Sequence, residues 1–527
     1  MTLPAQSALA VSASYPAPAP VPAVEYRSQG RLLIVGEAPE AYEVAAALAT
    51  SLPVTLLHVG NDAAPEAGFT LLGGEVVSIA GWLGEFSVVW KSAAGSVQTS
   101  AFDLVLNLTS NRYFTMHQPP QGYFAPEGGA ALEQALMEIR DGVGEFEKPK
   151  FFLYNEKICA HSRSRLQGCD LCIDVCSTEA IRTDGDRIRV EPHLCMGCGA
   201  CATVCPSGAM QYNFPSVSYW GGKLKAMLEA YRADGGEDAC LLLHDPADGA
   251  ALAQSSALPA NVIPLEVFHV ASLSLDRLLG AIALGANRVC ILTTGKEAPQ
   301  YAAALREQMV LGEQILDGLG YGGGHFHLLN AQALSALGEI PPAIVPRDVA
   351  SFRLFDEKRT TLDFCIEHFV RHAPSEVPDE IALSGDAPYG TIAVNGASCT
   401  LCLSCVSACP AAALQDGAGA PMLKFIERNC VQCGLCENAC PENAITLHAR
   451  LLLTPEVKQA RILHQDTPFC CVNCGKPFAT THMIGSMLHK LSGHSMFATP
   501  EAKRRLQMCG DCRVVDMMGK QMSGEGR

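Results

Sequence analysis

Two short cysteine runs in the C-terminal third constrain this chain more than any other feature. They read CTLCLSCVSACP at 399–410 and CVQCGLCENACP at 430–441, so each has the pattern CxxCxxCxxxCP. Such a run holds a [4Fe-4S] cluster with three thiolates and lends its fourth cysteine to a neighbouring cluster. A structural zinc site more often uses two separated CxxC pairs. The pattern therefore favours iron–sulfur clusters over zinc.

The crossed fourth ligand predicts how these eight cysteines are shared. One cluster is predicted to take Cys399, Cys402, Cys405 and Cys440, and its partner Cys409, Cys430, Cys433 and Cys436. The proline after each fourth cysteine suits the first turn of the helix that leads to the other site.

Residues 151–215 hold another eight cysteines, which indicates an internal duplication of the module. The run CMGCGACATVCP at 195–206 is intact, but its partner is broken, because nine residues separate Cys159 from Cys169. A loop of this length can bring its ends together at little entropic cost. The predicted ligand sets are therefore Cys159, Cys169, Cys172 and Cys205, and Cys176, Cys195, Cys198 and Cys201. The alternative is that the first of these clusters is lost or is [3Fe-4S].

The inserted loop carries His161, Arg163 and Arg165. We expect these residues to lie over a cluster near the surface, where positive charge would favour the reduced state and attract an acidic partner. The alternative is a solvated insertion without a role.

Both modules resemble the bacterial two-cluster ferredoxin family, with two copies fused in one chain. The sequence departs from the family at the displaced Cys159 and at Ser177, where the family has proline. The resemblance implies four [4Fe-4S] clusters and one-electron transfer at low potential between closely paired clusters.

A third kind of cysteine group lies in the C-terminal region. The two CxxC pairs in CVNCGKPF (471–478) and CGDC (509–512) predict a tetrahedral Zn²⁺ site, similar to a zinc ribbon or treble clef. Its predicted ligands are Cys471, Cys474, Cys509 and Cys512, with Cys470 left over. A fifth iron–sulfur cluster and a redox-active disulfide are the alternatives.

The region 31–150 opens with LLIVGEAPEAYEVAAALA, which resembles the dinucleotide-binding start of flavin disulfide-reductase-like proteins. Of the three GxGxxG positions only Gly36 remains, with Ala38 and Ala41 at the other two. The second glycine normally lets the backbone approach the pyrophosphate. We therefore predict a degenerate Rossmann-like domain that does not bind FAD or NAD. The alternative is a live FAD or NAD site.

The region 216–390 alternates apolar runs with helical patterns, which predicts an α/β domain. The stretch from Val262 to Leu292 is similar to the delta subunit of methyl-viologen-reducing hydrogenase, a partner of heterodisulfide reductase. That family's cysteines would fall near Glu266 and Thr293, and they are absent here. The relation implies a docking role without a cluster, with Cys240 and Cys290 as buried apolar thiols.

Composition excludes several classes of function. The formal charge of −16 argues against a nucleic-acid partner. No stretch is apolar enough for a membrane span, and the Ala/Pro-rich residues 1–30 read as a flexible arm without signal-peptide features. Most of the 24 cysteines fall in metal-type spacings rather than a disulfide framework, so we expect a cytoplasmic protein.

The expected architecture is multidomain, α/β plus α+β. After the arm come the Rossmann-like domain (31–150), the first ferredoxin-like module (151–215), the α/β docking domain (216–390), the second module (391–450) and a zinc-ribbon-like domain (451–527).

The function expected from these features is electron transfer through four clusters, as a subunit or partner of a larger redox complex. Examples are a molybdenum-dependent formate dehydrogenase, a hydrogenase or a heterodisulfide-reductase-like enzyme. The alternatives are a flavin- or nicotinamide-dependent iron–sulfur oxidoreductase and an accessory or assembly factor for a redox enzyme.

Overall fold

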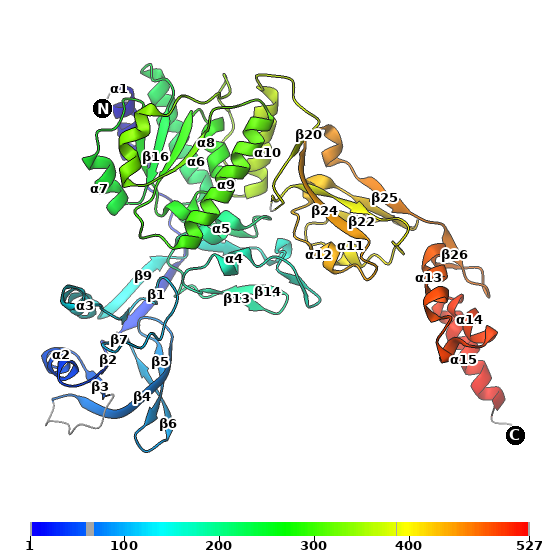
Figure 1. Cartoon of the computed structure of the whole chain (residues 1–527), viewed down its shortest axis with the longest axis horizontal. Coiled ribbons are helices and arrows are strands. Elements are labelled where there is room, and N and C mark those ends of the chain that lie inside the picture. Colours follow the sequence, from blue (N-terminus) through cyan, green and yellow to red (C-terminus); the bar gives the residue numbers. More distant parts are fainter. Residues whose placement is uncertain (1–2, 59–67, 386, 525–527) are drawn as a thin grey trace.

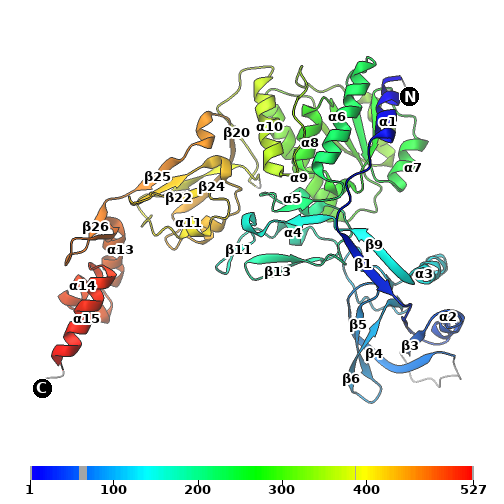
Figure 2. The same cartoon turned by 180° about the vertical axis from the view of Figure 1, so that it is seen from behind.

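The computed structural model describes residues 3–58, 68–385 and 387–524. Figure 1 shows an extended arrangement of lobes: the middle domain sits above the first module, the N-terminal domain hangs below it, and the second module leads to the C-terminal helices at the far end. The reverse view in Figure 2 shows the same order.

The N-terminal residues differ from the flexible arm predicted for 1–30. α1 (Leu3–Ser14) packs against α6 (Val217–Ala233), and Ala8 joins the buried core of the middle domain. β1 (Ala23–Ser28) then pairs antiparallel with β9 (Gly144–Pro149). Alanine has the highest helix propensity, and α6 supplies a surface on which that helix can bury its small side chains.

The N-terminal domain is built on a seven-stranded sheet of order β6-β5-β4-β3-β2-β7-β8. Neighbours from β4 to β8 run parallel, whereas β5 and β6 are antiparallel. Alternate side chains of β2 enter two separate cores, one of them shared with α2. The elements are β2 (Leu32–Gly36), α2 (Glu40–Leu48), β3 (Val54–His58), β4 (Thr70–Ala80), β5 (Phe86–Ser92), β6 (Val97–Phe102), β7 (Leu104–Asn107), β8 (Tyr123–Phe124) and α3 (Gly129–Asp141).

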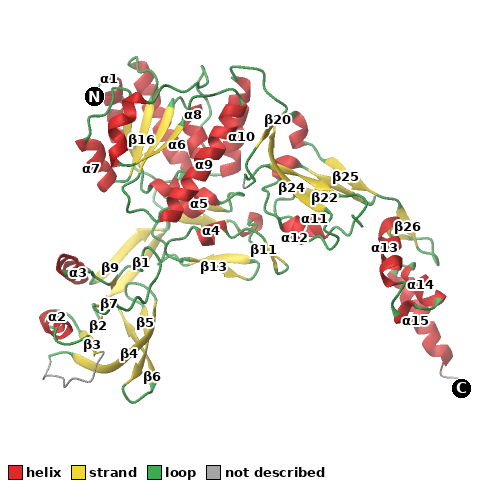
Figure 3. Cartoon of the chain, viewed as in Figure 1, coloured by secondary structure: helices red, strands yellow, loops and turns green. Residues whose placement is uncertain are grey.

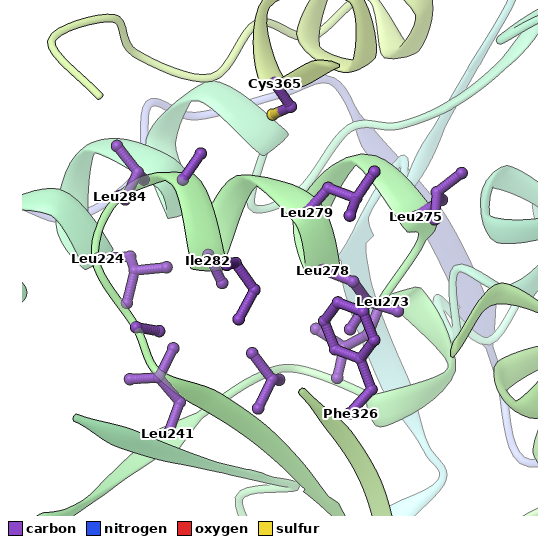
Figure 4. Close-up of a cluster of buried hydrophobic side chains, with 14 of the residues drawn as sticks. Leu224, Leu241, Leu273, Leu275, Leu278, Leu279, Ile282, Leu284, Phe326 and Cys365 are labelled. Carbon is purple, nitrogen blue, oxygen red and sulfur yellow. The ribbon is translucent and has the colours of Figure 1, made fainter. Parts of the chain in front are cut away.

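The middle domain has a parallel sheet of order β17-β16-β18-β19. Helix α8 is buried along its whole length because strands cover one side and α10 the other. Figure 4 shows Leu278 and Ile282 between α8 and the strands, and Cys365 of α10 on the opposite side. The elements are β16 (Cys240–His244), α7 (Asp248–Ser255), β17 (Val262–Glu266), η2 (Val270–Ser272), α8 (Leu275–Ala283), β18 (Arg288–Leu292), α9 (Pro299–Gly318), β19 (Phe326–Leu329), η3 (Ala331–Glu339) and α10 (Lys358–Arg371).

The two cysteine-rich modules share one topology. Figure 3 shows the short helices α4 and α5 in the first module and α11 and α12 in the second. In each, the first strand pairs antiparallel with a late strand, and a hairpin lies between the two halves. The first module has β10 (Phe152–Tyr154), η1 (Glu156–Ile158), β11 (Ser162–Arg163), β12 (Leu166–Gln167), α4 (Leu171–Asp174), β13 (Ile181–Asp184), β14 (Arg187–Val190), α5 (Ala200–Val204) and β15 (Met210–Tyr212). The second has β21 (Gly390–Val394), α11 (Ser404–Ala408), β22 (Leu414–Asp416), β23 (Met422–Phe425), η4 (Glu427–Asn429), α12 (Leu435–Asn438) and β24 (Ile445–Leu452).

The boundaries of the second module differ from those predicted. β20 (Glu380–Ala382), from the predicted docking domain, pairs with β24, and β25 (Arg461–Gln465) pairs with β23 after η5 (Pro455–Lys458). The small cysteine-rich C-terminal domain therefore begins after Gln465 rather than at 451. It contains β26 (Pro468–Cys470), β27 (Pro477–Thr480), α13 (Thr481–Leu491), η6 (Ser495–Phe497), α14 (Pro500–Leu506) and α15 (Gly510–Gly524).

Candidate functional site

In the first module, Cys176, Cys195, Cys198 and Cys201 line one apolar cavity, and Cys159, Cys172 and Cys205 lie in the apolar core of the module. Burial and the neighbouring thiols Cys205, Cys169 and Cys159 raise the pKa of Cys172. Burial and the nearby Cys198, Cys195 and Cys176 likewise raise the pKa of Cys201. We call Cys159, Cys169, Cys172 and Cys205 the inner first set, and Cys176, Cys195, Cys198 and Cys201 the outer first set. Their membership is the one proposed from the spacing of the cysteines.

The second module repeats this arrangement. Burial, followed by Cys402, Cys399 and Cys440, raises the pKa of Cys405 to about 12. Burial and the thiols Cys430, Cys433 and Cys409 raise the pKa of Cys436. We call Cys399, Cys402, Cys405 and Cys440 the outer second set, and Cys409, Cys430, Cys433 and Cys436 the inner second set.

These groups of thiols have the surroundings that a metal cluster requires. The inner second set lines an apolar cavity together with Ile392, Phe425 and Leu447. The two outer sets line similar cavities. Thiolates in such places would be costly without a compensating positive charge, because burial penalises the ionised form. Iron supplies that charge in a [4Fe-4S] cluster, so the donor sets fit this group.

Backbone conformation explains how the three intact runs surround a common centre. In each run the residue before and the residue after the second cysteine have positive φ. These residues are Gly197, Gly199, Leu401, Leu403, Gln432 and Gly434. Left-handed residues reverse the chain direction, so that successive cysteines point inwards. The broken run does not repeat this, since Asp170, after its second cysteine, has φ of −113°.

A short antiparallel ladder closes the loop between Cys159 and Cys169. The Gly168 N–H donates to the His161 carbonyl, and the Cys169 N–H donates to the Ala160 carbonyl, each at 2.8 Å. Nδ1 of His161 lies 2.7 Å from the Asp170 carboxylate. His161 is 3% exposed and belongs to the base of the loop, whereas Arg163 is half-buried and Arg165 is exposed.

The outer first set is covered by two other domains. The Tyr26 hydroxyl and the Lys148 ammonium, from β1 and β9, both donate to the His193 carbonyl, at 2.6 and 2.9 Å. Trp82 stacks on the His193 ring with 4.6 Å between ring centroids. His193 lies two residues before Cys195. These contacts from the N-terminal domain therefore fix the chain next to a proposed ligand of the outer first set.

Helix α9 of the middle domain reaches the same set through Tyr301, which is 1% exposed. The Tyr301 hydroxyl hydrogen-bonds the Ser177 hydroxyl and the Cys198 thiol. Burial raises the pKa of Cys198 to about 11, although the Tyr301 hydrogen bond opposes the rise. Sequence reasoning missed Tyr301, because it is 124 positions from Ser177 in the chain. The one sign of this contact in the sequence was Ser177, which stands where the ferredoxin family has proline.

The four C-terminal cysteines also come together. The ligand atoms of Cys471, Cys474, Cys509 and Cys512 all lie within 4.8 Å of one another. The first two lie in the β26–β27 hairpin and the last two at the start of α15. Asn473 Nδ2 donates to Cys512 Sγ at 3.3 Å. The predicted ligand atoms therefore lie close enough to share one ion.

Histidines between these pairs have other partners. Nδ1 of His482 is 2.9 Å from the Cys399 carbonyl, and the Thr480 hydroxyl donates to the Thr400 carbonyl at 3.1 Å. These contacts hold the C-terminal domain against the outer second set.

The remaining cysteines of the middle domain are buried. Cys240 Sγ and Cys290 Sγ are 3.6 Å apart on neighbouring strands, and both residues are fully buried.

In the N-terminal domain, a Cβ added at Gly36 would come within 2.7 Å of the Ala41 Cβ. Gly36 therefore permits close packing of β2 against α2.

Comparison with known proteins identifies the two cysteine-rich modules. The 4Fe-4S dicluster domain family matches residues 398–445, and a second family of the same description matches residues 167–209. The chain contains two 4Fe-4S dicluster domains of the ferredoxin type. This supports at least two [4Fe-4S] clusters. The match to the first dicluster domain begins at residue 167 and so leaves Cys159 outside it.

Individual relatives agree with this identification. The chain is 37% identical over 42 residues to a ferredoxin (Ferredoxin 7Fe) of Hydrogenibacillus schlegelii and 32% identical over 60 residues to a ferredoxin of Saccharopolyspora erythraea. These matches cover 8% and 11% of this chain, and 54% and 57% of the relatives.

A further match, 40% identical over 79 residues, is to the indolepyruvate oxidoreductase subunit IorA of Pyrococcus horikoshii and covers 15% of this chain and 11% of that subunit. The shared part is thus a small fraction of the larger relative.

Among the described residues, no helix combines the length and the apolar character needed to cross a bilayer.

Proposed function

We propose that the chain relays single electrons through four [4Fe-4S] clusters, one in each of the four cysteine sets, as a subunit or partner of a cytoplasmic redox complex. The observation that carries this proposal is that three of the four proposed cysteine sets each line one apolar cavity, while Cys159, Cys172 and Cys205 of the fourth lie in the apolar core of the first module. When bound, the clusters supply one-electron redox chemistry. The protein holds the thiols, excludes water from them and sets their hydrogen bonds.

Anaerobic titration with dithionite tests this proposal. We expect about four electron equivalents per chain, because each [4Fe-4S] cluster accepts one electron at accessible potentials. Iron and acid-labile sulfide measured on the same sample should each be close to sixteen per chain. Clusters that are present but cannot be reduced and reoxidised would contradict a relay and favour an assembly role.

The flanking domains are proposed to dock the relay to its partners. The N-terminal domain and α9 both contact the outer first set, whereas the C-terminal domain contacts the outer second set. Ala38 and Ala41, which stand at the second and third glycine positions, support a structural role for the N-terminal domain without FAD or NAD. Flavin at one per chain after anaerobic purification would contradict this and favour a flavin-dependent oxidoreductase.

Replacing Tyr301 with phenylalanine is expected to lower the midpoint potential of the cluster held by the outer first set. A hydrogen bond to a cluster sulfur stabilises the more negative reduced state. A hydrogen bond contributes about 1 kcal/mol, and about 59 mV corresponds to a tenfold change in the equilibrium constant of a one-electron couple. Losing the bond should therefore shift the midpoint potential by roughly 50 mV. The measurement is an EPR-monitored redox titration.

Tyr321→Phe is the matched control for this variant. Tyr321 is equally buried in the same domain, and its hydroxyl donates to the Phe369 carbonyl at 2.9 Å. Its removal should leave every cluster potential unchanged. Equal potentials in both variants would exclude a tuning role for Tyr301.

A further inference from the structure

The loop between Cys159 and Cys169 lies against the second dicluster domain. Ala160, Ala408 and Leu435 form a buried apolar cluster, and Leu166, Cys169 and Cys433 pack against it. The Asn438 side chain donates from Nδ2 to the Gln167 carbonyl at 3.0 Å, across 271 positions of sequence. The insertion that breaks the first cysteine run is therefore the contact between the two domains.

The contact places the two inner sets next to each other. Cys169 of the inner first set and Cys433 of the inner second set pack against the same buried cluster of Ala160, Ala408 and Leu435. Within each domain, cysteines of both sets border one shared apolar core, which contains Phe152 in the first domain and Phe425 in the second. The four sets thus follow one another in the order outer first, inner first, inner second, outer second.

Several interactions keep the loop in place. The Asp186 carboxylate accepts from the Ser164 and Arg165 N–H groups at 2.9 and 3.1 Å and from the Ser162 hydroxyl at 2.8 Å. A Cβ added at Gly168 would lie 2.3 Å from the Ala160 carbonyl oxygen and 2.8 Å from Leu435 Cγ. The loop is thus tied to the β13–β14 turn on one side and packed closely on α12 on the other.

Helix α10 of the middle domain contacts both dicluster domains. The buried Lys358 ammonium donates to the carbonyls of Ala202, Thr203 and Cys205 in the first domain. The next residue, Arg359, donates to the carbonyls of Arg428 and Cys430 in the second. Two adjacent side chains of one helix therefore set the spacing between the inner sets.

We propose that the loop 160–168 is an electron bridge, which joins the two dicluster domains into one four-cluster relay by holding the inner first set against the inner second set. This inference rests on the proposed function. In the step across the bridge, one inner cluster is oxidised by one electron and the other is reduced by one, and no proton or ligand is transferred. Without the bridge, the chain would contain two separate two-cluster relays.

The test compares Leu166→Glu with Leu153→Glu in the full-length, cluster-loaded chain. Leu166 packs in the contact, whereas Leu153 lies on β10 of the same domain and is 47% exposed. Leu166→Glu buries a carboxylate in the contact and should push the domains apart, because an ionised side chain is not accommodated in an apolar interface. Leu153→Glu makes the same change on a solvated face.

The main readout is the EPR spectrum of the fully reduced protein, in which neighbouring reduced clusters broaden and split each other's signals. In the parent and in Leu153→Glu, we expect magnetic interaction between the inner clusters in addition to that within each domain. Leu166→Glu should lose this additional interaction, while iron content and the number of reducible clusters stay unchanged. Electron exchange between the domains should slow at least tenfold.

Identical spectra and identical exchange rates in the two variants would overturn the bridge. Missing clusters, or clusters that cannot be reduced in the parent, would instead overturn the proposed function, so the two failures are distinguishable. If Leu166→Glu does not fold, Gly168→Ala supplies the second variant, because its methyl group would clash with the Ala160 carbonyl oxygen and with Leu435 and so displace the loop with no added charge. It should weaken the interaction in the same direction.

Discussion

Replacing Cys159 with alanine is expected to lower the iron content of anaerobically purified protein from about sixteen to about twelve atoms per chain, because four thiolates hold each [4Fe-4S] cluster. Cys159 is the one proposed ligand of the first module outside the family match, so its replacement tests the broken run directly. Cys205→Ala should cause the same loss, since the structure places Cys205 in the same set. Iron and sulfide analysis measures both.

Cys365→Ala is the control for this pair. Cys365 is fully buried in α10, and its pKa is raised by burial and then by Asp276 rather than by other thiols. Its replacement should leave the iron content unchanged. Twelve irons in the parent, with no further loss in Cys159→Ala, would show that the first cluster is absent. A drop of one iron in Cys159→Ala would indicate conversion to [3Fe-4S].

Replacing Cys509 with alanine should release one Zn²⁺ per chain and unfold the C-terminal domain after Gln465. The buried cluster of that domain consists of Cys471, Met508 and Cys509, with Phe478 and Cys512 packed against it. So small a core cannot stabilise a fold by itself. A structural zinc contributes about 10 kcal/mol or more at neutral pH. Limited proteolysis should therefore trim the variant back to the second dicluster domain.

Cys470→Ala is the control variant, because it removes a neighbouring cysteine that is not one of the four proposed ligands. Cys470 is exposed and lies outside the group of four. Its replacement should leave both zinc content and protease resistance unchanged. Four additional irons in the parent in place of zinc would assign a fifth cluster to this site, and a parent without metal would favour the disulfide.

Much of the candidate site could be predicted from spacing because a cluster dictates how its ligands are arranged. Three thiolates on one tight loop and a fourth from the partner run leave few ways to share eight cysteines. Ligand spacing alone is therefore enough to propose the membership of the sets that contain Cys205 and Cys440. Likewise, two CxxC pairs are enough to predict that Cys471 and Cys509 meet.

Other predictions were less successful because they depended on surfaces that lie far apart in the sequence. The Ala/Pro-rich arm is helical over Leu3–Ser14 because α6 covers it. His161, Arg163 and Arg165 in the loop 160–168 were expected to lie over a cluster near the surface and to attract an acidic partner. Leu166 and Gly168 instead face α12, and no local pattern could reveal that partner.

The sequence by itself was enough to predict the number, kind and membership of the cysteine groups, since ligand spacing is a local property of the chain. The tertiary structure decided their order, the contact between the inner sets, and which side chains surround each set. Tyr301, Lys358 and Arg359 act across packed interfaces. Their roles depend on how the middle domain holds the two dicluster domains, and that placement arises from many long-range contacts together.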